Sequence, residues 1–183
     1  MVEVGFQPKK ILEVLRKHDV KFVVLGGIAS AIYGSPFPTG DVDVCPALDT
    51  GNLGRLTSAL KDLDAVMLAT DEPNGLKLDF TGRSLKKWLA DFKLLNFMTK
   101  YGQLDLLLRP AGTEGYRDLS RNAIVEDLGG ELEITIASLN DVIRSKQAAG
   151  RQRDLEQLPT LRKLLEHHEK SNSTGESEPK DHS

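Results

Sequence analysis

VVLGGIASAIYGSPFPTGDVDV, residues 23–44, combines two adjacent glycines, a polar turn and two aspartates within one short stretch. The apolar residues before Gly26 are typical of a buried strand, and the small residues after Gly27 predict a short helix that begins at the glycines. The segment DVDV then predicts a second strand, on which Asp41 and Asp43 share one face because strand side chains alternate. Two carboxylates are therefore expected to point the same way from one strand.

A bound cation would account for two carboxylates on one face of a strand, because it would neutralise both charges. Like charges held close together repel and resist burial unless something neutralises them, and oxygen ligands at this spacing suit Mg²⁺. Asp105, alone in the apolar segment GQLDLLL, is a candidate for a third carboxylate. Three carboxylates on adjacent strands could hold two metals about 4 Å apart, as nucleotidyl transfer requires. The spacing alone is weak, because Asp62 and Asp64 repeat it at the end of an amphipathic helix, where we interpret both as solvated.

The two glycines and the polar turn add a possible binding site for phosphate. Glycines between a strand and a helix allow close approach of the backbone to a ligand, and the start of the helix offers free N–H groups. Ser30 lies within reach of this turn, and Thr39 is placed to hydrogen-bond either the turn or an incoming phosphate. The sequence contains neither a Walker pattern nor G-x-G-x-x-G. A tight turn with glycine chosen for packing is the alternative for Gly26 and Gly27.

The rest of the chain predicts an α+β fold, with helices clustered at both ends of a small mixed sheet. We expect a single domain over residues 1–168, with a C-terminal helical part at 138–168, and a disordered polar tail at 169–183. Beyond residues 23–44, predicted helices cover 8–18, 51–63, 85–91, 114–123, 139–150 and 153–168, with Thr50, Ser84 and Ser138 as caps. Predicted strands cover 65–69, 76–80, 92–99, 103–109 and 132–138.

The composition is that of an ordinary globular protein that works outside membranes. The chain has 39% hydrophobic and 28% charged residues and a formal net charge of -3. It lacks an apolar run of the ~18 residues that a membrane span needs, and its N-terminus lacks the apolar core of a signal peptide. Its one cysteine, Cys45, cannot form an internal disulfide. We therefore expect a cytoplasmic protein with no membrane partner.

These residues together resemble the minimal nucleotidyltransferases related to polymerase β, especially the AbiEii/MenT toxin-like group. The opening motif of that group is matched in order and spacing by Gly26, Gly27, Gly34, Thr39, Asp41 and Asp43. Asp105 takes the place of the third carboxylate, and SKQAAGRQRDL matches a downstream segment through Lys146, Arg151 and Asp154. The resemblance spans about residues 20–160. It implies a nucleotidyltransferase fold with a small mixed sheet, packed helices and a helical C-terminal part.

The resemblance also implies roles for individual residues. It makes Asp41, Asp43 and Asp105 the ligands of Mg²⁺, with Asp105 or a nearby hydroxide activating the acceptor. It implies that Gly26, Gly27, Ser30 and Thr39 bind the nucleotide and that Lys146 contacts its β- or γ-phosphate. Asp154 would order Lys146 or touch the nucleotide. Considered alone, Lys146 near a helix end is better explained as a solvated charge that favours the helix dipole, and Asp154 at a helix start can have the same explanation.

The implied function is that of a toxin in a toxin-antitoxin system. Such an enzyme transfers NMP, often a pyrimidine nucleotide, from NTP to the 3′ end of tRNA and so blocks translation. The implied partners are NTP, tRNA, a cognate antitoxin and a kinase that silences the enzyme at Thr39. Cations in 83–121 and 144–163 permit contact with a phosphate backbone without being diagnostic of it.

Two other functions remain open at this stage. One is NMP transfer to a protein hydroxyl, which is AMPylation when ATP is the donor. The other is a degenerate nucleotidyltransferase-fold module that only binds, which is favoured by Phe37, where the family usually carries Arg. The intact carboxylates oppose this second alternative, because two repelling aspartates have no evident use once the metal is lost.

Overall fold

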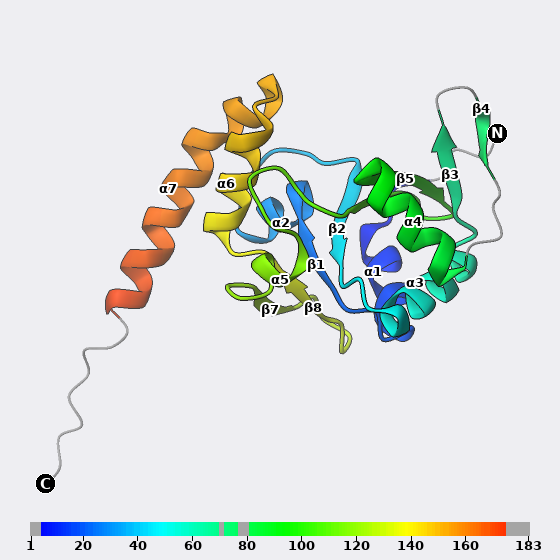
Figure 1. Cartoon of the computed structure of the whole chain (residues 1–183). Coiled ribbons are helices and arrows are strands. Elements are labelled where there is room, and N and C mark those ends of the chain that lie inside the picture. Colours follow the sequence, from blue (N-terminus) through cyan, green and yellow to red (C-terminus); the bar gives the residue numbers. More distant parts are fainter. Residues whose placement is uncertain (1–4, 70–71, 77–80, 175–183) are drawn as a thin grey trace, which may run out of the picture.

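The strand that carries the two aspartates lies inside a mixed eight-stranded sheet (Figure 1). The sheet has the order β4-β3-β5-β6-β2-β1-β8-β7. Strands β1 and β2 are antiparallel, whereas β2 and β6 are parallel, as are β1 and β8. The computed structural model describes residues 5–69, 72–76 and 81–174. These features confirm the predicted α+β class with its mixed sheet.

Helices and strands succeed one another without a regular repeat. The first half of the chain contains α1 (Pro8–Lys17), β1 (Phe22–Leu25), α2 (Gly26–Ile32), β2 (Asp41–Pro46), α3 (Thr50–Asp62), β3 (Val66–Ala69), β4 (Glu72–Leu76) and α4 (Gly82–Phe92). The second half contains β5 (Leu94–Thr99), β6 (Gly102–Leu107), α5 (Tyr116–Leu119), β7 (Ile124–Asp127), β8 (Glu133–Ile136), α6 (Leu139–Ala149) and α7 (Gln152–Thr174).

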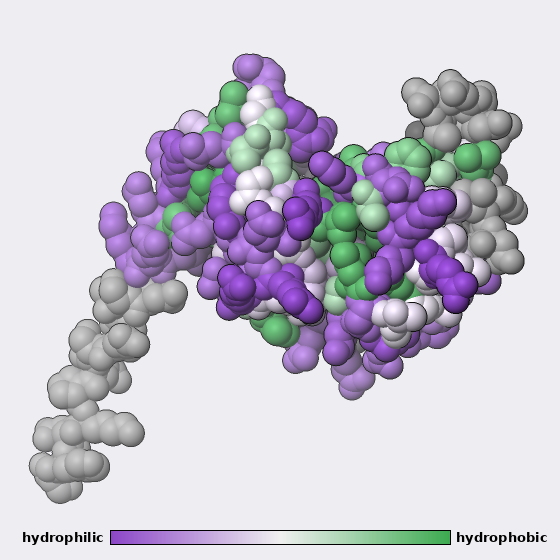
Figure 2. All heavy atoms as spheres, in the orientation of Figure 1, coloured by the Kyte–Doolittle hydropathy of each residue, from purple (hydrophilic) through white to green (hydrophobic). Residues whose placement is uncertain are grey.

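The two faces of β2 have different environments. Val42 and Val44 are fully buried in the core, to which α1, α3 and α4 contribute their leucine-rich faces. Asp41 and Asp43 point to the other face, where α2 packs against β1 and β2, and α6 packs against α2. Helix α7 then projects away from the body, and hydrophilic residues cover most of the face shown in Figure 2. Within the described residues, no helix is long and apolar enough to cross a membrane.

Several boundaries differ from those predicted. Asp49, not Thr50, caps α3 by accepting from the backbone N–H of Asn52, and Thr81 caps α4 with Ser84 as its capping-box partner. In each pair a polar side chain stands close to the true cap, so sequence alone could not separate the two positions. Ser138 caps α6 as predicted.

Three further segments depart from the expectation. Strand β7 was not predicted because its four residues, IVED, place two apolar residues before two acidic ones instead of alternating, and it forms by pairing with β8. The predicted helix at 114–123 is only the single turn of α5. Helix α7 continues to Thr174, so 169–174 is helical rather than disordered, because extending a formed helix avoids the cost of nucleation. The remainder of the predicted tail, 175–183, and most of the predicted strand 76–80 lie outside the described residues.

The glycines at the start of α2 allow this helix to approach β2 closely. Gly26 has a positive φ of 64°, and a Cβ added there would lie 1.9 Å from Oδ2 of Asp43. A Cβ on Gly27 would lie 2.2 Å from Oγ1 of Thr39. Both glycines are therefore required by close contact with polar side chains, not merely by a tight turn.

The substitution Gly26→Ala tests this requirement. It would strain a backbone conformation that L-residues rarely adopt and displace the Asp43 carboxylate. We expect it to destabilise the protein by at least about 1 kcal/mol in urea unfolding. The control Gly54→Ala lies inside α3, where a Cβ meets nothing within 4 Å, and is expected to stabilise by up to about 1 kcal/mol. Equal unfolding midpoints for the two variants would contradict this account.

Candidate active site

Strands β2 and β6 bring three carboxylates together. In the parallel register of these strands, Asp43 pairs directly with Asp105, and Asp41 pairs with Gln103. Asp105 is 7% exposed, while Asp41 and Asp43 are half-buried. One ligand oxygen from each of the three carboxylates lies within 4.8 Å of the others. The structure therefore places the three predicted metal ligands in one cluster.

Polar neighbours orient two of these three carboxylates. Oγ1 of Thr39 donates to Oδ1 of Asp41 at 3.0 Å, and Nε2 of Gln103 donates to Oδ1 of Asp105 at 3.0 Å. Asn96 lies directly opposite Asp105 on β5, and its side-chain amide lowers the pKa of Asp105. The carboxylate of Asp43, unlike its backbone, accepts no hydrogen bond from any residue that the structure describes. Asp43 is thus the carboxylate in greatest need of a cation.

Burial and charge repulsion make this cluster costly without a cation. Burial, followed by the charges of Asp41 and Asp105, raises the pKa of Asp43 to about 7. Burial also raises the pKa of Asp105, although the side-chain amides of Asn96 and Gln103 act in the opposite direction. An all-oxygen set of crowded carboxylates fits Mg²⁺, which would neutralise the repulsion and keep positions for substrate phosphates. We infer that Asp41, Asp43 and Asp105 would hold this ion.

Two cations and a buried aspartate come from the junction of α6 and α7. Lys146 is only 8% exposed, and its Nζ lies 3.1 Å from Oδ1 of Asp154. Arg151 donates from Nε to the other oxygen of Asp154. Burial raises the pKa of Asp154, but the hydrogen bonds and charges of Arg151 and Lys146 outweigh this effect and lower it overall. Gly150, at a positive φ of 64°, ends α6 and lets α7 begin beside it.

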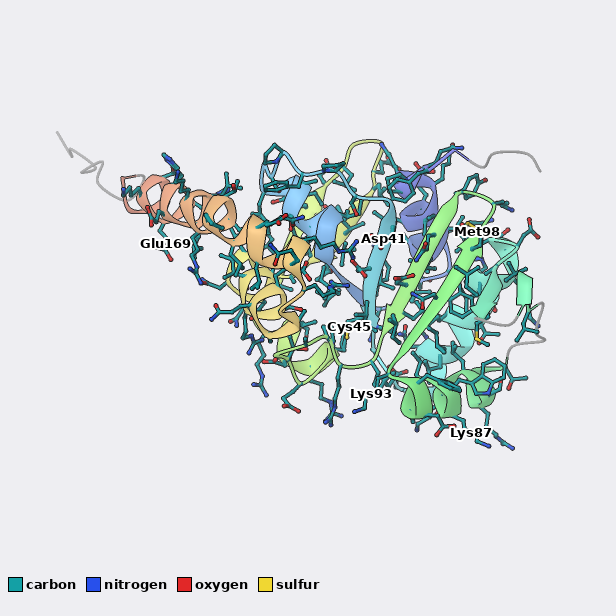
Figure 3. All side chains as sticks on the ribbon, turned by 90° about the horizontal axis from the view of Figure 1, so that it is seen from above. Asp41, Cys45, Lys87, Lys93, Met98 and Glu169 are labelled. Carbon is teal, nitrogen blue, oxygen red and sulfur yellow. The ribbon has the colours of Figure 1, made fainter. Side chains whose placement is uncertain are left out.

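A cavity of about 270 Å³ lies between these cations and the carboxylates. In Figure 3, Asp41 lies at the start of β2, with α2 and α6 on one side and the strand that carries Met98 on the other. Every predicted site residue except Asp105 lines the cavity: Gly26, Gly27, Ser30, Thr39, Asp41, Asp43, Lys146 and Asp154. Asp105 lies next to it, beside Asp43. The cavity is thus acidic on the strand side and basic on the helix side.

Some expectations for single residues are refined by these contacts. The Ser30 hydroxyl donates to the carbonyl of Gly26 at 2.8 Å, so its proton is already used within α2. Lys146 and Asp154 are buried partners and not the solvated helix-end charges that their positions alone permitted. Phe37 lines the cavity, where positive charge comes instead from Lys146, Arg151 and Arg153.

The two amide side chains beside Asp105 were not predicted from the sequence. Gln103 lies two residues before Asp105 on the same face, and Asn96 lies directly opposite Asp105 in the β5–β6 hairpin. The tight turn between Thr99 and Gly102 fixes this register, so the pairing of Asn96 with Asp105 could have been counted from the sequence.

Several cations considered for contact with RNA already have acidic partners. Arg144 pairs with Asp118 and Asp141 at 2.8 Å, Lys100 pairs with Asp64, and Arg109 pairs with Glu114. Ion pairs of this kind weaken the positive potential that a phosphate backbone would meet. The cations that line the cavity are therefore better placed for a small anionic substrate than for a long backbone.

Comparison with solved structures identifies the architecture. The lincosamide antibiotic adenylyltransferase LnuA, in its lincomycin-bound form, superposes with a TM-score of 0.56 and 12% identity over 87% of this chain and 99% of LnuA. The chain has the nucleotidyltransferase fold. No family model matches the sequence, and no curated protein matches it.

Two further structures align over most of this chain with lower TM-scores. TM1012 from Thermotoga maritima, assigned as a nucleotidyltransferase, has a TM-score of 0.47 and 17% identity over 90% of this chain and 98% of its own. JHP933 from Helicobacter pylori has a TM-score of 0.44 and 19% identity over 88% of this chain and 67% of its own.

The variant Asp43→Asn tests the cost of the unneutralised cluster. Because the native pKa of Asp43 is about 7, against 3.8 ordinarily, the folded state holds this proton more tightly than the unfolded state. The carboxylate therefore destabilises the fold increasingly as pH rises from about 4 to 7, and fully above 7. We expect Asp43→Asn to melt several degrees higher than wild type at pH 8 without metal.

Mg²⁺ should raise the melting temperature of wild type and leave that of Asp43→Asn almost unchanged, because a ligand stabilises only the state that binds it. The matched control is Asp64→Asn, which alters the exposed member of the other Asp-x-Asp pair and should respond to Mg²⁺ like wild type. An equal shift for Asp43→Asn and wild type would show that the cluster is not the metal site.

The variant Asp154→Asn tests the buried ion pair. Removing this carboxylate leaves Lys146 buried without its partner, which should cost about 3–5 kcal/mol in urea unfolding at pH 7. Because the native pKa of Asp154 is lowered, the difference should shrink as pH falls through that pKa, below about 4. Glu13→Gln removes an exposed bridge to Lys10 and should cost less than about 1 kcal/mol. Similar costs for both variants would contradict the assignment.

Proposed function

We propose that this protein is a Mg²⁺-dependent nucleotidyltransferase that transfers NMP from an NTP to an acceptor hydroxyl and releases pyrophosphate. The observation that carries the proposal is the cluster of Asp41, Asp43 and Asp105 at the edge of a cavity lined by cations. A carboxylate cluster alone is common on protein surfaces, but here burial desolvates Asp43 and Asp105, and the cluster faces cations across the cavity. The fold shared with LnuA supports the same chemistry.

In this proposal, different residues bind the triphosphate, position the cations and accept the proton. Bound Mg²⁺ would neutralise charge on the phosphates and the carboxylates. Lys146 and Arg151 would bind the triphosphate, with Asp154 holding both cations in place. Asp105, with its raised pKa, would accept the proton of the acceptor hydroxyl. The bond from the acceptor oxygen to the α-phosphorus forms as the bond from that phosphorus to pyrophosphate breaks.

The first candidate acceptor is the 3′ end of tRNA, as the sequence resemblance to the AbiEii/MenT toxin-like group implies. In this proposal the protein is the cytoplasmic toxin of a toxin-antitoxin system, transfers a pyrimidine nucleotide and is neutralised by a cognate antitoxin. Thr39 would be the target of a silencing kinase. A phosphate on its hydroxyl, which now donates to Asp41 at 3.0 Å, would add about two negative charges beside the carboxylates and oppose binding of metal and triphosphate.

The second candidate acceptor is the hydroxyl of a small molecule. LnuA adenylylates a lincosamide, and this chain covers 99% of its length. A cavity of about 270 Å³ that is lined in part by Phe37 and Leu107 has room for such a group next to the carboxylates. The acidic partners of Arg144 and Lys100 also reduce the surface that an RNA would need.

Labelled nucleotides would test the function and separate the acceptors. Purified protein is incubated with Mg²⁺, each labelled NTP in turn, and total tRNA, lincomycin or a protein extract. We expect label to appear on one acceptor class and to fall at least 100-fold with Asp41→Ala, because the ion loses a ligand. Asp64→Ala, which removes an exposed carboxylate that does not line the cavity, should leave transfer unchanged.

Each acceptor gives a distinct result. Label on tRNA supports the toxin, label on lincomycin the small-molecule enzyme, and label on protein an AMPylator. Absence of label on every acceptor with all four NTPs would favour a module that binds without catalysis, and Phe37 would then be the first residue to examine.

A further inference from the structure

Asp105 is the member of the carboxylate cluster with the smallest exposed surface, and two amide side chains lie beside it. It is 7% exposed on β6, between β2 and β5. Gln103 reaches it from the same strand, with Nε2 3.0 Å from Oδ1. Asn96 reaches it from the directly opposite position on β5. Two amide side chains on one sheet face thus converge on one carboxylate.

Amide donors have a particular advantage at this position. A lysine or arginine would neutralise the carboxylate and compete with a metal ion, whereas a neutral amide orients the carboxylate and leaves its charge intact. Both donors project from paired strands, whose register fixes their distance from Asp105. Because little water reaches a buried side chain, the bond from Gln103 and the amide of Asn96 opposite it are the groups placed to restrict the orientation of Asp105.

We propose that Gln103 and Asn96 are positioning residues that hold Asp105 in the orientation required for it to share a metal ion with Asp41 and Asp43. This inference rests on the proposed function. It adds residues that orient a metal ligand without binding the metal themselves. Thr39 supports Asp41 in the same way at 3.0 Å. Two of the three ligands are therefore oriented before the ion arrives, and Asp43 is fixed by the ion itself.

Binding of Mn²⁺ to the full-length protein, measured by titration calorimetry without nucleotide, tests the proposal independently of any acceptor. Gln103→Met and Asn96→Leu preserve side-chain size and remove the donor. We expect each variant to bind Mn²⁺ at least about tenfold more weakly than wild type, as is usual when partners of metal ligands are lost. Gln157→Met makes the same chemical change in the same cavity, on α7, and should leave Mn²⁺ affinity within twofold of wild type. Circular dichroism and melting curves establish that each variant is folded.

Transfer activity provides a second readout that a purely structural role would not reproduce. If Gln103 acts by positioning a metal ligand, the Mg²⁺ concentration for half-maximal transfer should rise about tenfold in Gln103→Met. Saturating Mg²⁺ should restore most of kcat, while KM for the NTP stays within about twofold. A general loss of folded protein would lower kcat at every Mg²⁺ concentration.

The outcomes separate this inference from the proposed function. If wild type binds Mn²⁺ and Asp41→Ala does not, while folded Gln103→Met and Asn96→Leu bind as well as wild type, the positioning role is overturned and the metal site stands. If wild type itself binds no Mn²⁺, both the metal site and the positioning role are overturned. Weak binding by both variants, with normal binding by Gln157→Met, supports the inference.

Discussion

Mutual repulsion of three crowded, partly buried carboxylates is the constraint around which this end of the sheet is organised. Parallel pairing of β2 with β6 sets Asp43 beside Asp105, and burial raises the pKa of Asp43 to about 7. Crowded, buried carboxylates destabilise the folded state unless a cation neutralises their charge. The nearby features serve the same requirement, because Thr39 and Gln103 orient two of the carboxylates and Gly26 allows α2 to approach the third.

The basic side of the cavity is formed where helix α6 ends and helix α7 begins. Gly150 ends helix α6 and lets the chain turn into α7. Lys146 and Asp154 therefore meet although they lie on different helices. Lysine is rarely buried, and its ammonium here is held by Asp154, which also binds Arg151. The arrangement places two cations opposite the carboxylates. A triphosphate with its metal ion is the ligand that would satisfy both sides of the cavity together.

Local patterns in the sequence predicted those parts of the site that depend on neighbouring residues. Strand alternation places Asp41 and Asp43 on one face, and the two glycines mark the start of α2. Long-range features were beyond such patterns: the parallel pairing of β2 with β6, the edge strand β7 and the burial of Lys146 each depend on segments far apart in the chain. Asp105 was identified because a lone carboxylate in an apolar strand is unusual, whereas Gln103 and Asn96 gave no such signal.

A crystal structure of the protein with Mn²⁺ and a non-hydrolysable NTP would decide whether the three carboxylates hold a metal ion, because anomalous scattering locates the ion without assumptions about the acceptor. The account predicts an anomalous peak bound by Asp41, Asp43 and Asp105, with the triphosphate between this peak and Lys146. An ion bound elsewhere, or a nucleotide whose phosphates lie away from the carboxylates, would contradict it.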